Sequence, residues 1–315
     1  MYVVTGSELR RLVPMTDAID AVGAAFRALS AGETEQPPRI SFADGTGLAM
    51  AARLDGGDAY KLVSLRPDNG ARGLPTIHAL VVWFDGVTGE PRLLVEGSAL
   101  TSLRTGAASG YATQLLAAPD ASTLAMIGAG GQAMDQVRAV CAVRPIERVR
   151  VFSPSGVSAR ALAERVEEEL DVRACAAASA EVAVEDADVV CCATSATSAV
   201  LAAETVAGRV HVNAVGSYRP EMRELPPELL AAAEVLAVDE VAAALAEAGE
   251  VIDAVERGVR ARGSLVEIGA VDVDPVELRS PTVFKSVGVA VQDWAICRLL
   301  DARITDGALS VDLAC

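Results

Sequence analysis

The chain has 315 residues, enough to bury a substantial core and to form two domains. Its formal net charge of −16 disfavours nucleic acid and anionic membranes as partners. No stretch approaches the roughly 20 uninterrupted apolar residues that span a membrane, and the N-terminal MYVVTGSELRRLV lacks the basic flank of a secretory signal. We therefore expect a cytoplasmic protein.

The composition also limits the chemistry. Hydrophobic residues make up 51% of the chain and are mostly Ala, Val and Leu, which is typical of α/β packing. The six cysteines form no CxxC pair and lie mostly in apolar runs, so we expect reduced, buried thiols and no metal site. A reaction that needs a titratable nitrogen has few candidates. The lysines and histidines are Lys61, Lys285, His78 and His211.

The first 118 residues predict a helix followed by a mostly antiparallel sheet. Apolar residues recur at helical spacing over 15–31, and QPPRI breaks that helix. A helix over 98–118, with Ser98 as its N-cap, follows the sheet. Strands separated by turn-rich segments are predicted at 48–54, 59–66, 76–85 and 91–97.

From residue 120 onward, apolar strands and helices alternate, which predicts a parallel, right-handed, doubly wound sheet of the Rossmann type. Helices are expected at 134–143 and 158–169, and the segment 282–294 reads as a last strand with a returning helix. The other strands are predicted at 124–127, 148–153, 171–175, 187–194, 209–217 and 234–239.

The most informative motif is TLAMIGAGGQA, an apolar strand that runs straight into a glycine turn and a helix. Gly128 allows the tight turn, and Gly130 lets backbone N–H groups approach a pyrophosphate. Gln132 completes the turn, and Ala133 is small enough for the following helix to pack closely on the strand, while the N-terminus of that helix attracts phosphate. In this context the motif predicts a dinucleotide site.

The residues after the second strand of this sheet bear on the choice of cofactor. An acidic residue there would bind the 2′-hydroxyl of NAD. The chain has Ser153 and Ser155 instead, with Arg160 close by in the sequence, and the two serines could hydrogen-bond a 2′-phosphate. The segment therefore favours NADP(H) over NAD(H).

Three basic residues ahead of the glycine turn are candidates for substrate chemistry. Arg39 follows two prolines that hold the backbone extended, and Arg104 lies among small residues in LTSLRTGAAS. Two such arginines together would clamp a carboxylate. Lys61, in the predicted strand AYKLVSLR, would have its pKa lowered by burial and by neighbouring cations, and could then transfer a proton near neutral pH.

The ordered set of motifs resembles the ornithine cyclodeaminase/μ-crystallin family over nearly the whole chain. The matching segments are QPPR, YKLVSLRPDN, GLPT, DGVTGEP, LTSLRTGAAS, IGAGGQA, DADVVCCATS, VNAVGSYRPEMREL and FKSVGVAVQDWA. Members of the family include ornithine and lysine cyclodeaminases, an archaeal alanine dehydrogenase, and reductases of Δ1-pyrroline-2-carboxylate or Δ1-piperideine-2-carboxylate. The resemblance implies a homodimer joined through the domain that does not bind the nucleotide.

The resemblance also implies roles for individual residues. Arg39 and Arg104 would bind the substrate carboxylate, and Lys61 would lie beside the reacting carbon. The cofactor contacts that it implies beyond the glycine turn are Thr105 at the diphosphate, Thr194 and Val215 along the path from adenosine to nicotinamide, and the segment from Ser286 to Gly288 over the nicotinamide end.

One departure from the pattern concerns the reaction. Cyclodeaminases and the alanine dehydrogenase carry an aspartate where this chain has Tyr218, which becomes a candidate substrate contact. A tyrosine is a poor base at pH 7, and GSYRPEMRE is more similar to the ketimine reductases. We expect NAD(P)H-dependent reduction of a cyclic ketimine carboxylate. The alternatives are an ornithine cyclodeaminase or alanine-type dehydrogenase, and a nucleotide-binding protein without catalysis.

The expected organisation is therefore α/β with two domains. Residues 1–118 together with 295–315 would form an α+β domain for substrate binding and dimerisation. Residues 119–294 would form the dinucleotide-binding domain. The expected partners are a small cyclic imine or amino acid and a second copy of the chain.

Overall fold

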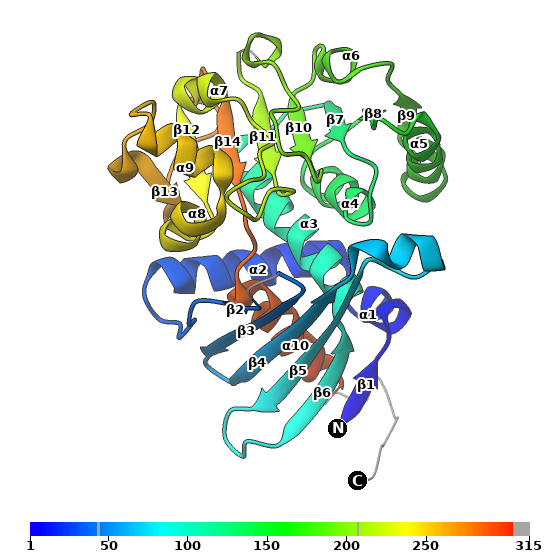
Figure 1. Cartoon of the computed structure of the whole chain (residues 1–315), viewed down its shortest axis with the longest axis vertical. Helices are drawn as coiled ribbons and strands as arrows, with labels where there is room; N and C mark the ends of the chain where they lie inside the picture. Colours follow the sequence, from blue (N-terminus) through cyan, green and yellow to red (C-terminus); the bar gives the residue numbers. More distant parts are fainter. Residues whose placement is uncertain (43–44, 207, 305–315) are drawn as a thin grey trace. The chain divides into compact units, whose positions relative to one another are not determined.

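The computed structural model describes residues 1–42, 45–206 and 208–304. The chain forms two compact units, one made of Met1–Arg104 with the chain from Val289 onward and the other of Thr105–Gly288 (Figure 1). Among the described residues, no helix combines the length and the apolar character needed to cross a membrane.

The first unit is built on a six-stranded sheet with the order β1-β6-β5-β4-β3-β2. All neighbouring strands are antiparallel except β1 and β6, which confirms the predicted, mostly antiparallel sheet. The strands are β1 (Tyr2–Val4), β2 (Ile40–Ser41), β3 (Gly47–Leu54), β4 (Gly57–Leu65), β5 (Ile77–Asp85) and β6 (Pro91–Glu96).

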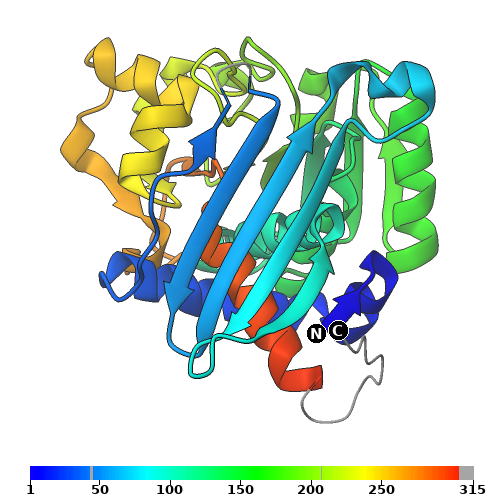
Figure 2. The same ribbon diagram turned by 60° about the horizontal axis from the view of Figure 1, so that its bottom comes forward.

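Helix α10 (Ala290–Arg303) crosses one face of this sheet (Figure 2). Side chains alternate along each strand, so Lys61 on β4 and Trp83 on β5 point to the covered face and are buried. Tyr60 and Leu62 point to the opposite face and are exposed. The other helices of this unit are α1 (Gly6–Leu12), α2 (Met15–Ser30), the start of α3 (Gly97–Leu116) and a 3-10 helix at Pro67–Arg72.

The second unit is an eight-stranded parallel sheet with the order β13-β12-β14-β11-β10-β7-β8-β9. From β7 the chain proceeds to β8 and β9 on one side and to β10 and β11 on the other, which confirms the predicted doubly wound fold, and the last strand, β14, inserts between β11 and β12. Its strands are β7 (Thr123–Ile127), β8 (Arg148–Phe152), β9 (Arg173–Ala176), β10 (Val189–Cys192), β11 (His211–Ala214), β12 (Val235–Val238), β13 (Leu265–Glu267) and β14 (Thr282–Lys285).

Both faces of the parallel sheet are covered by helices (Figure 1). Along β7, Leu124 and Met126 join one core while Ala125 and Ile127 join the other. A strand buried on both faces reads as a continuous apolar run, which is how β7 was found in the sequence. The helices are α4 (Ala133–Val143), α5 (Gly156–Leu170), α6 (Ala180–Val184), α7 (Pro227–Ala232), α8 (Val241–Glu247) and α9 (Gly249–Glu256), with 3-10 helices at Ala203–Thr205, Arg262–Ser264 and Ile268–Ala270.

The units divide at 104/105 and 288/289, earlier than the predicted 118/119 and 294/295. From Thr105 on, α3 packs within the second unit, where its Thr113 Oγ1 accepts a hydrogen bond from Asn213 at 2.9 Å. The start of α10 belongs to the first unit, where the Val291 N–H donates to Gln36 at 2.8 Å. A helical pattern does not show which unit each turn will contact.

Ser98 does not cap α3. The helix begins at Gly97, and the carboxylate of Glu96 accepts the N–H groups of Ser98 at 2.8 Å and Ala99 at 2.7 Å. A carboxylate that binds the first N–H groups of a helix also interacts favourably with the helix dipole. The predicted serine cap was therefore wrong, and the acid two residues earlier takes its place.

The cysteines follow the predicted pattern only in part. None of the five described cysteines is in a disulfide, and Cys191, Cys192 and Cys297 are buried. Cys175 is exposed, so the expectation of buried thiols was wrong there. Cys315 lies outside the described residues.

Candidate functional site

A buried ion pair between Lys61 and Asp293 joins the sheet of the first unit to helix α10. Lys61 faces α10 from β4, and Asp293 lies in the first turn of that helix. The Lys61 Nζ donates to Asp293 Oδ1 at 3.2 Å. The exposed fractions of the two residues are only 3% and 2%. Because an unpaired buried charge is costly, each member of the pair stabilises the other in its charged form.

Arg104 shares the same carboxylate. Its Nε lies 3.4 Å from Asp293 Oδ1, and its Nη1 donates to Gln292 Oε1 at 2.5 Å. The same Gln292 oxygen accepts the N–H of Val289 at 3.0 Å, so one side chain fixes both the start of α10 and the Arg104 guanidinium. Asp293 Oδ2 has no donor among the described residues. The guanidinium is held in one orientation, as bidentate binding of a carboxylate requires.

Burial lowers the pKa of Lys61 to about 8. Desolvation is the largest cause, the Asp293 carboxylate opposes it, and the positive charges of Arg104 and Arg39 lower the pKa further. This is the shift that the sequence predicted. An amine with a pKa near 8 can gain or lose a proton close to neutral pH, which suits it to proton transfer.

The structure thus brings together Arg39 and Arg104, which were predicted to bind the substrate carboxylate, and Lys61, which was predicted to lie beside the reacting carbon. With Lys61 protonated, the group carries three positive charges, and Asp293 supplies one negative charge. The surplus of positive charge favours a small anion such as a carboxylate. Direct contact of each residue with a substrate remains a prediction.

Sequence reasoning missed Asp293 and Gln292. Both lie in FKSVGVAVQDWA, which was interpreted as a strand with a returning helix and, by resemblance, as a cofactor contact at Ser286 to Gly288. Both are buried and both contact Arg104. The available signal was the adjacent Gln-Asp pair in an otherwise apolar helix start, since buried polar side chains need partners.

In the second unit, the glycine turn lies between β7 and α4. Gly128 has a φ of +101°, and a Cβ there would lie 2.5 Å from the carbonyl oxygen of Ala193, so the turn requires glycine. A Cβ on Gly130 or Gly131 would meet no atom within 4 Å. This open space and the start of α4 at Ala133 let a diphosphate approach backbone N–H groups. The residues present therefore fit a dinucleotide.

Two further residues predicted to bind the cofactor lie beside this turn. Gln132 occupies the N-cap position of α4. Thr105 is buried on α3, and its neighbour Gly106 packs so closely on α4 that a Cβ would lie 2.4 Å from the carbonyl oxygen of Asp135. Thr105 therefore lies near the first turn of α4, where the diphosphate contact is predicted.

The loop between β8 and α5 contains the two serines predicted to choose the cofactor. Ser155 is the N-cap of α5, and its hydroxyl accepts the N–H of Ser158 at 3.3 Å. Ser153 is half-buried just after β8. The Nη1 of Arg160 lies 3.4 Å from the Cβ position that Gly156 leaves empty. A guanidinium is therefore folded back against this loop.

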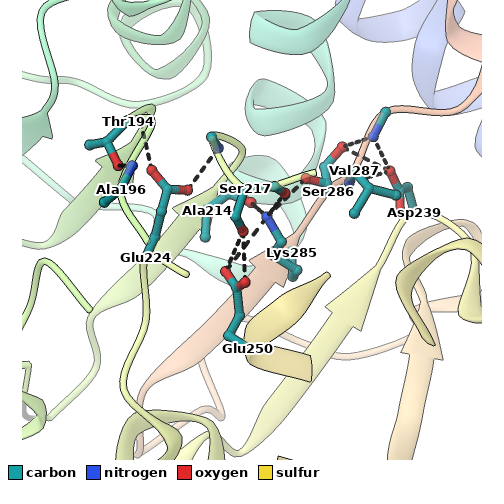
Figure 3. Close-up of polar contacts among 12 residues, drawn as sticks. Thr194, Ala196, Ala214, Ser217, Glu224, Asp239, Glu250, Lys285, Ser286 and Val287 are labelled. Carbon is teal, nitrogen blue, oxygen red and sulfur yellow. Dashed lines mark hydrogen bonds and ion pairs between the residues drawn. The ribbon is translucent and has the colours of Figure 1, made fainter. Parts of the chain in front are cut away.

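The other residues predicted to contact the cofactor follow the carboxyl ends of three parallel strands. Thr194 comes after β10, Val215 after β11, and Ser286 and Gly288 after β14. These ends share one edge of the sheet, the edge at which doubly wound folds bind ligands. Buried carboxylates and a lysine connect the loops there (Figure 3).

Tyr218 lies on the loop after β11. It is half-buried, packs against the core of the second unit, and has the guanidinium of Arg219 5.4 Å from its ring centroid. Its proposed contact with substrate remains a prediction.

The histidines are not part of either group. His211 is fully buried, bonded to Thr282 at 2.9 Å and Asn213 at 3.1 Å, and burial lowers its pKa to about 3. At neutral pH it is therefore uncharged and serves to hold the strands together, and His78 is exposed. No group of three His, Cys, Asp or Glu side chains among the described residues could hold a metal ion.

The sequence pattern of the ornithine cyclodeaminase/mu-crystallin family matches residues 2–308. The chain belongs to this family. The predicted resemblance is therefore confirmed, and with it the α/β fold with a doubly wound parallel sheet in one of two units.

Three similar proteins illustrate the relationship. A Δ1-pyrroline-2-carboxylate reductase of Bacillus cereus is 37% identical over 97% of both chains. The solved structure of the Thermococcus litoralis Δ1-pyrroline-2-carboxylate reductase, in complex with NADH and L-proline, has a TM-score of 0.92 and 32% identity and covers 99% of this chain and 100% of its own. The solved structure of an archaeal alanine dehydrogenase dimer with bound NAD has a TM-score of 0.89 and 30% identity, and the match covers 99% of this chain and 98% of its own.

Two glycine variants distinguish the residue that the fold of the turn requires, Gly128, from the residue that leaves space for the cofactor, Gly130. Gly130→Ala adds a methyl group to open space, so it should leave the free energy of unfolding within about 0.5 kcal/mol of wild type. The same methyl group should weaken nicotinamide dinucleotide binding on the order of tenfold by blocking the approach of the diphosphate. Gly128→Ala should instead destabilise the fold, by about 1–3 kcal/mol, because of its positive φ and the Ala193 oxygen. Urea unfolding and fluorescence titration measure both effects, and unchanged cofactor affinity in Gly130→Ala would contradict the assignment.

Proposed function

We propose that this chain catalyses the NAD(P)H-dependent reduction of a cyclic ketimine carboxylate, such as Δ1-pyrroline-2-carboxylate, to the cyclic amino acid. The observation that carries the proposal is the buried group of Lys61, Arg104 and Asp293, in which a proton donor lies beside a fixed guanidinium. The dinucleotide turn of the second unit and the Bacillus and Thermococcus reductases support it.

The two arginines bind the substrate carboxylate in this account. Arg104 is held by Gln292 and Asp293 on one side, which leaves its guanidinium oriented before a substrate arrives. Arg39 is close enough to Lys61 to lower its pKa and so lies near the same place. A clamp of this kind fixes both the position and the rotation of a planar ring acid.

Lys61 manages the proton. A ketimine accepts hydride at carbon far better when its nitrogen is protonated, because the electron pair of the C=N bond then neutralises a positive charge. With its pKa near 8, the Lys61 ammonium can donate a proton to the ring nitrogen or keep it protonated. The ring nitrogen ends as a secondary amine after carbon has received the hydride.

The nicotinamide cofactor supplies the hydride. The chain's own contribution is to hold the cofactor, through the glycine turn and through Thr105 beside it. We further propose that NADP(H) is preferred, because Ser153, Ser155 and the guanidinium of Arg160 lie at the loop after β8, where a 2′-phosphate would bind. No acid competes for that position within 153–158.

A homodimer formed through the first unit is also proposed. The uncovered face of its sheet exposes Tyr60, Leu62 and Leu80, with exposed fractions of 42%, 57% and 48%. In the register of the sheet, Leu62 lies directly opposite Leu80. A contiguous apolar area on one sheet face is typical of an interface between subunits. The archaeal alanine dehydrogenase is described as a dimer.

The direct test of the proposed function is to follow the oxidation of NADPH and of NADH with Δ1-pyrroline-2-carboxylate and with its six-membered homologue. We expect saturable oxidation with at least one ring, and faster oxidation with NADPH than with NADH. Ammonia release from ornithine or alanine with NAD⁺, and no ketimine reduction, would replace the proposal with a deaminating activity.

The pH dependence tests the role of Lys61. Turnover should fall as pH rises through about 8, where the ammonium loses its proton. Asp293 raises the pKa of Lys61, so in Asp293→Asn this fall in turnover, the alkaline limb of the pH profile, should occur at lower pH. In a separate measurement, Lys61→Met should lower kcat about 10²–10⁴-fold and leave cofactor affinity nearly unchanged. Asp301→Asn, which removes another carboxylate from α10, is the matched control and should leave the limb in place. An unmoved limb in Asp293→Asn would remove Asp293 from the account.

Sedimentation equilibrium tests the dimer. Wild type should sediment as a dimer, and Leu62→Glu should produce monomers because it puts a charge in the apolar face. Val157→Glu, at an exposed apolar residue of the second unit, is the control and should remain dimeric. A monomeric wild type would contradict the proposal.

A further inference from the structure

A group of fully buried charges lies under the loops at the carboxyl edge of the parallel sheet (Figure 3). Its members are Glu224, Asp239, Glu250 and Lys285, each with an exposed fraction of at most 2%. None of them contributes to the Lys61 site, and all lie in the second unit. Buried carboxylates are costly unless donors satisfy them, so the partners of each indicate what it does.

Asp239 follows β12 and holds the loop after β14. Its Oδ2 accepts three hydrogen bonds, from Ser286 Oγ at 2.9 Å, the Val287 N–H at 2.9 Å and the Gly288 N–H at 2.7 Å. Its Oδ1 accepts the N–H of Glu240 at 3.1 Å. One carboxylate therefore fixes three consecutive residues, including Gly288 with its φ of +81°.

The contacts of Asp239 also define what Ser286 can do. The Ser286 hydroxyl donates its proton to Asp239 and accepts the N–H of Gly288 at 3.1 Å. Its single O–H donor is already in use. Ser286 therefore contributes to this loop mainly by the conformation that it and Asp239 impose together.

Glu224 makes a similar connection between the loops after β10 and β11. Its Oε1 accepts the N–H of Thr194 and its Oε2 the N–H of Gly216, both at 2.7 Å. The two loops approach so closely that a Cβ on Gly216 would lie 2.2 Å from the carbonyl oxygen of Thr194. Burial raises the pKa of Glu224, and Lys285 and the two N–H groups oppose that shift.

Lys285 supplies the positive charge of the group. Its Nζ donates to the carbonyl oxygens of Ala214 at 3.2 Å, Ser217 at 2.6 Å and Ser286 at 3.1 Å, and lies 3.6 Å from Glu250. It thereby ties the loop after β11 to the loop after β14. The loops after β10, β11 and β14, which are predicted to line the cofactor path towards the nicotinamide end, are therefore each bonded to a member of this buried group.

We propose that Asp239 and Glu224 are positioning residues for the nicotinamide cofactor, holding Ser286–Gly288 and the Thr194 and Gly216 loops in the conformation that binds it. This proposal rests on the proposed function. Both oxygens of each carboxylate accept hydrogen bonds. In Asp239→Asn or Glu224→Gln an NH2 group, which cannot accept, replaces one oxygen, so at least one donor is left without an acceptor. A loop freed in this way loses the order that binding requires.

The experiment compares Asp239→Asn and Glu224→Gln with wild type and with Asp188→Asn. Asp188 is the matched control, because its Oδ2 accepts the backbone N–H groups of Ser122 and Thr123 at 2.8 and 2.9 Å, but at the opposite, amino-terminal edge of the same sheet. Fluorescence titration gives the Kd for NADPH and NADH. Hydrogen exchange of the protein without cofactor reports on the loops themselves.

Asp239→Asn and Glu224→Gln should raise the cofactor Kd on the order of tenfold or more, and Asp188→Asn should leave it within about twofold. Exchange should quicken at the Val287 and Gly288 amides in Asp239→Asn, and at the Thr194 and Gly216 amides in Glu224→Gln. If one variant does not fold, the other still tests the proposal, because each carboxylate holds its own loop.

Two results would overturn the positioning role alone. These are an unchanged cofactor Kd in the folded variants, and an equal loss of affinity in Asp188→Asn, which would reveal a general loss of stability. If wild type binds neither NADPH nor NADH, the proposed function fails and the positioning role fails with it. The readout on wild type therefore separates the two failures.

Discussion

The first unit depends on one carboxylate oxygen shared by two buried cations. Asp293 Oδ1 binds the Lys61 ammonium and lies beside the Arg104 guanidinium, in a place where either cation alone would be expensive to bury. The Asp293 carboxylate keeps the pKa of Lys61 at about 8 although burial, Arg104 and Arg39 all lower it. The same contact orients Arg104. The proton donor and the carboxylate clamp of the proposed reaction therefore have a common physical origin.

The second unit uses buried carboxylates differently. Glu224 and Asp239 bind mainly backbone N–H groups and therefore fix the conformation of loops. Asp293, in contrast, binds side-chain cations and helps to set the pKa of Lys61. The sheet gives every loop the same starting edge, but irregular backbone needs its N–H groups satisfied when it is buried. A carboxylate can satisfy several backbone N–H groups at once, because each of its oxygens accepts more than one hydrogen bond. Small residues such as Gly216 let the loops approach closely enough to share one acid.

Much of this organisation was predictable from local sequence. The apolar run of β7 and the glycines that follow it specify a strand, a turn and a helix through short-range sterics. The predicted burial of Lys61 in its strand is also what the structure shows. Asp293 and Gln292 were missed because their partners are far away in the sequence, and only the packing of α10 on the sheet brings them to Lys61 and Arg104. The division of α3 between the two units escaped prediction for the same reason. The N-cap of α3 could have been predicted from nearby residues, but the general preference for serine at N-caps favoured Ser98 over Glu96.

The measurement that tests the central claim most directly is the titration of the lysine side chains by NMR. The chain has only two lysines, so protein labelled at lysine Nζ and Cε should give two signals, assigned with Lys61→Met. The account predicts that Lys61 titrates near 8 and that Asp293→Asn lowers this pKa further. A Lys61 that titrates near the ordinary value of about 10.4, or that ignores the loss of Asp293, would contradict the claim that this buried ion pair sets the proton supply.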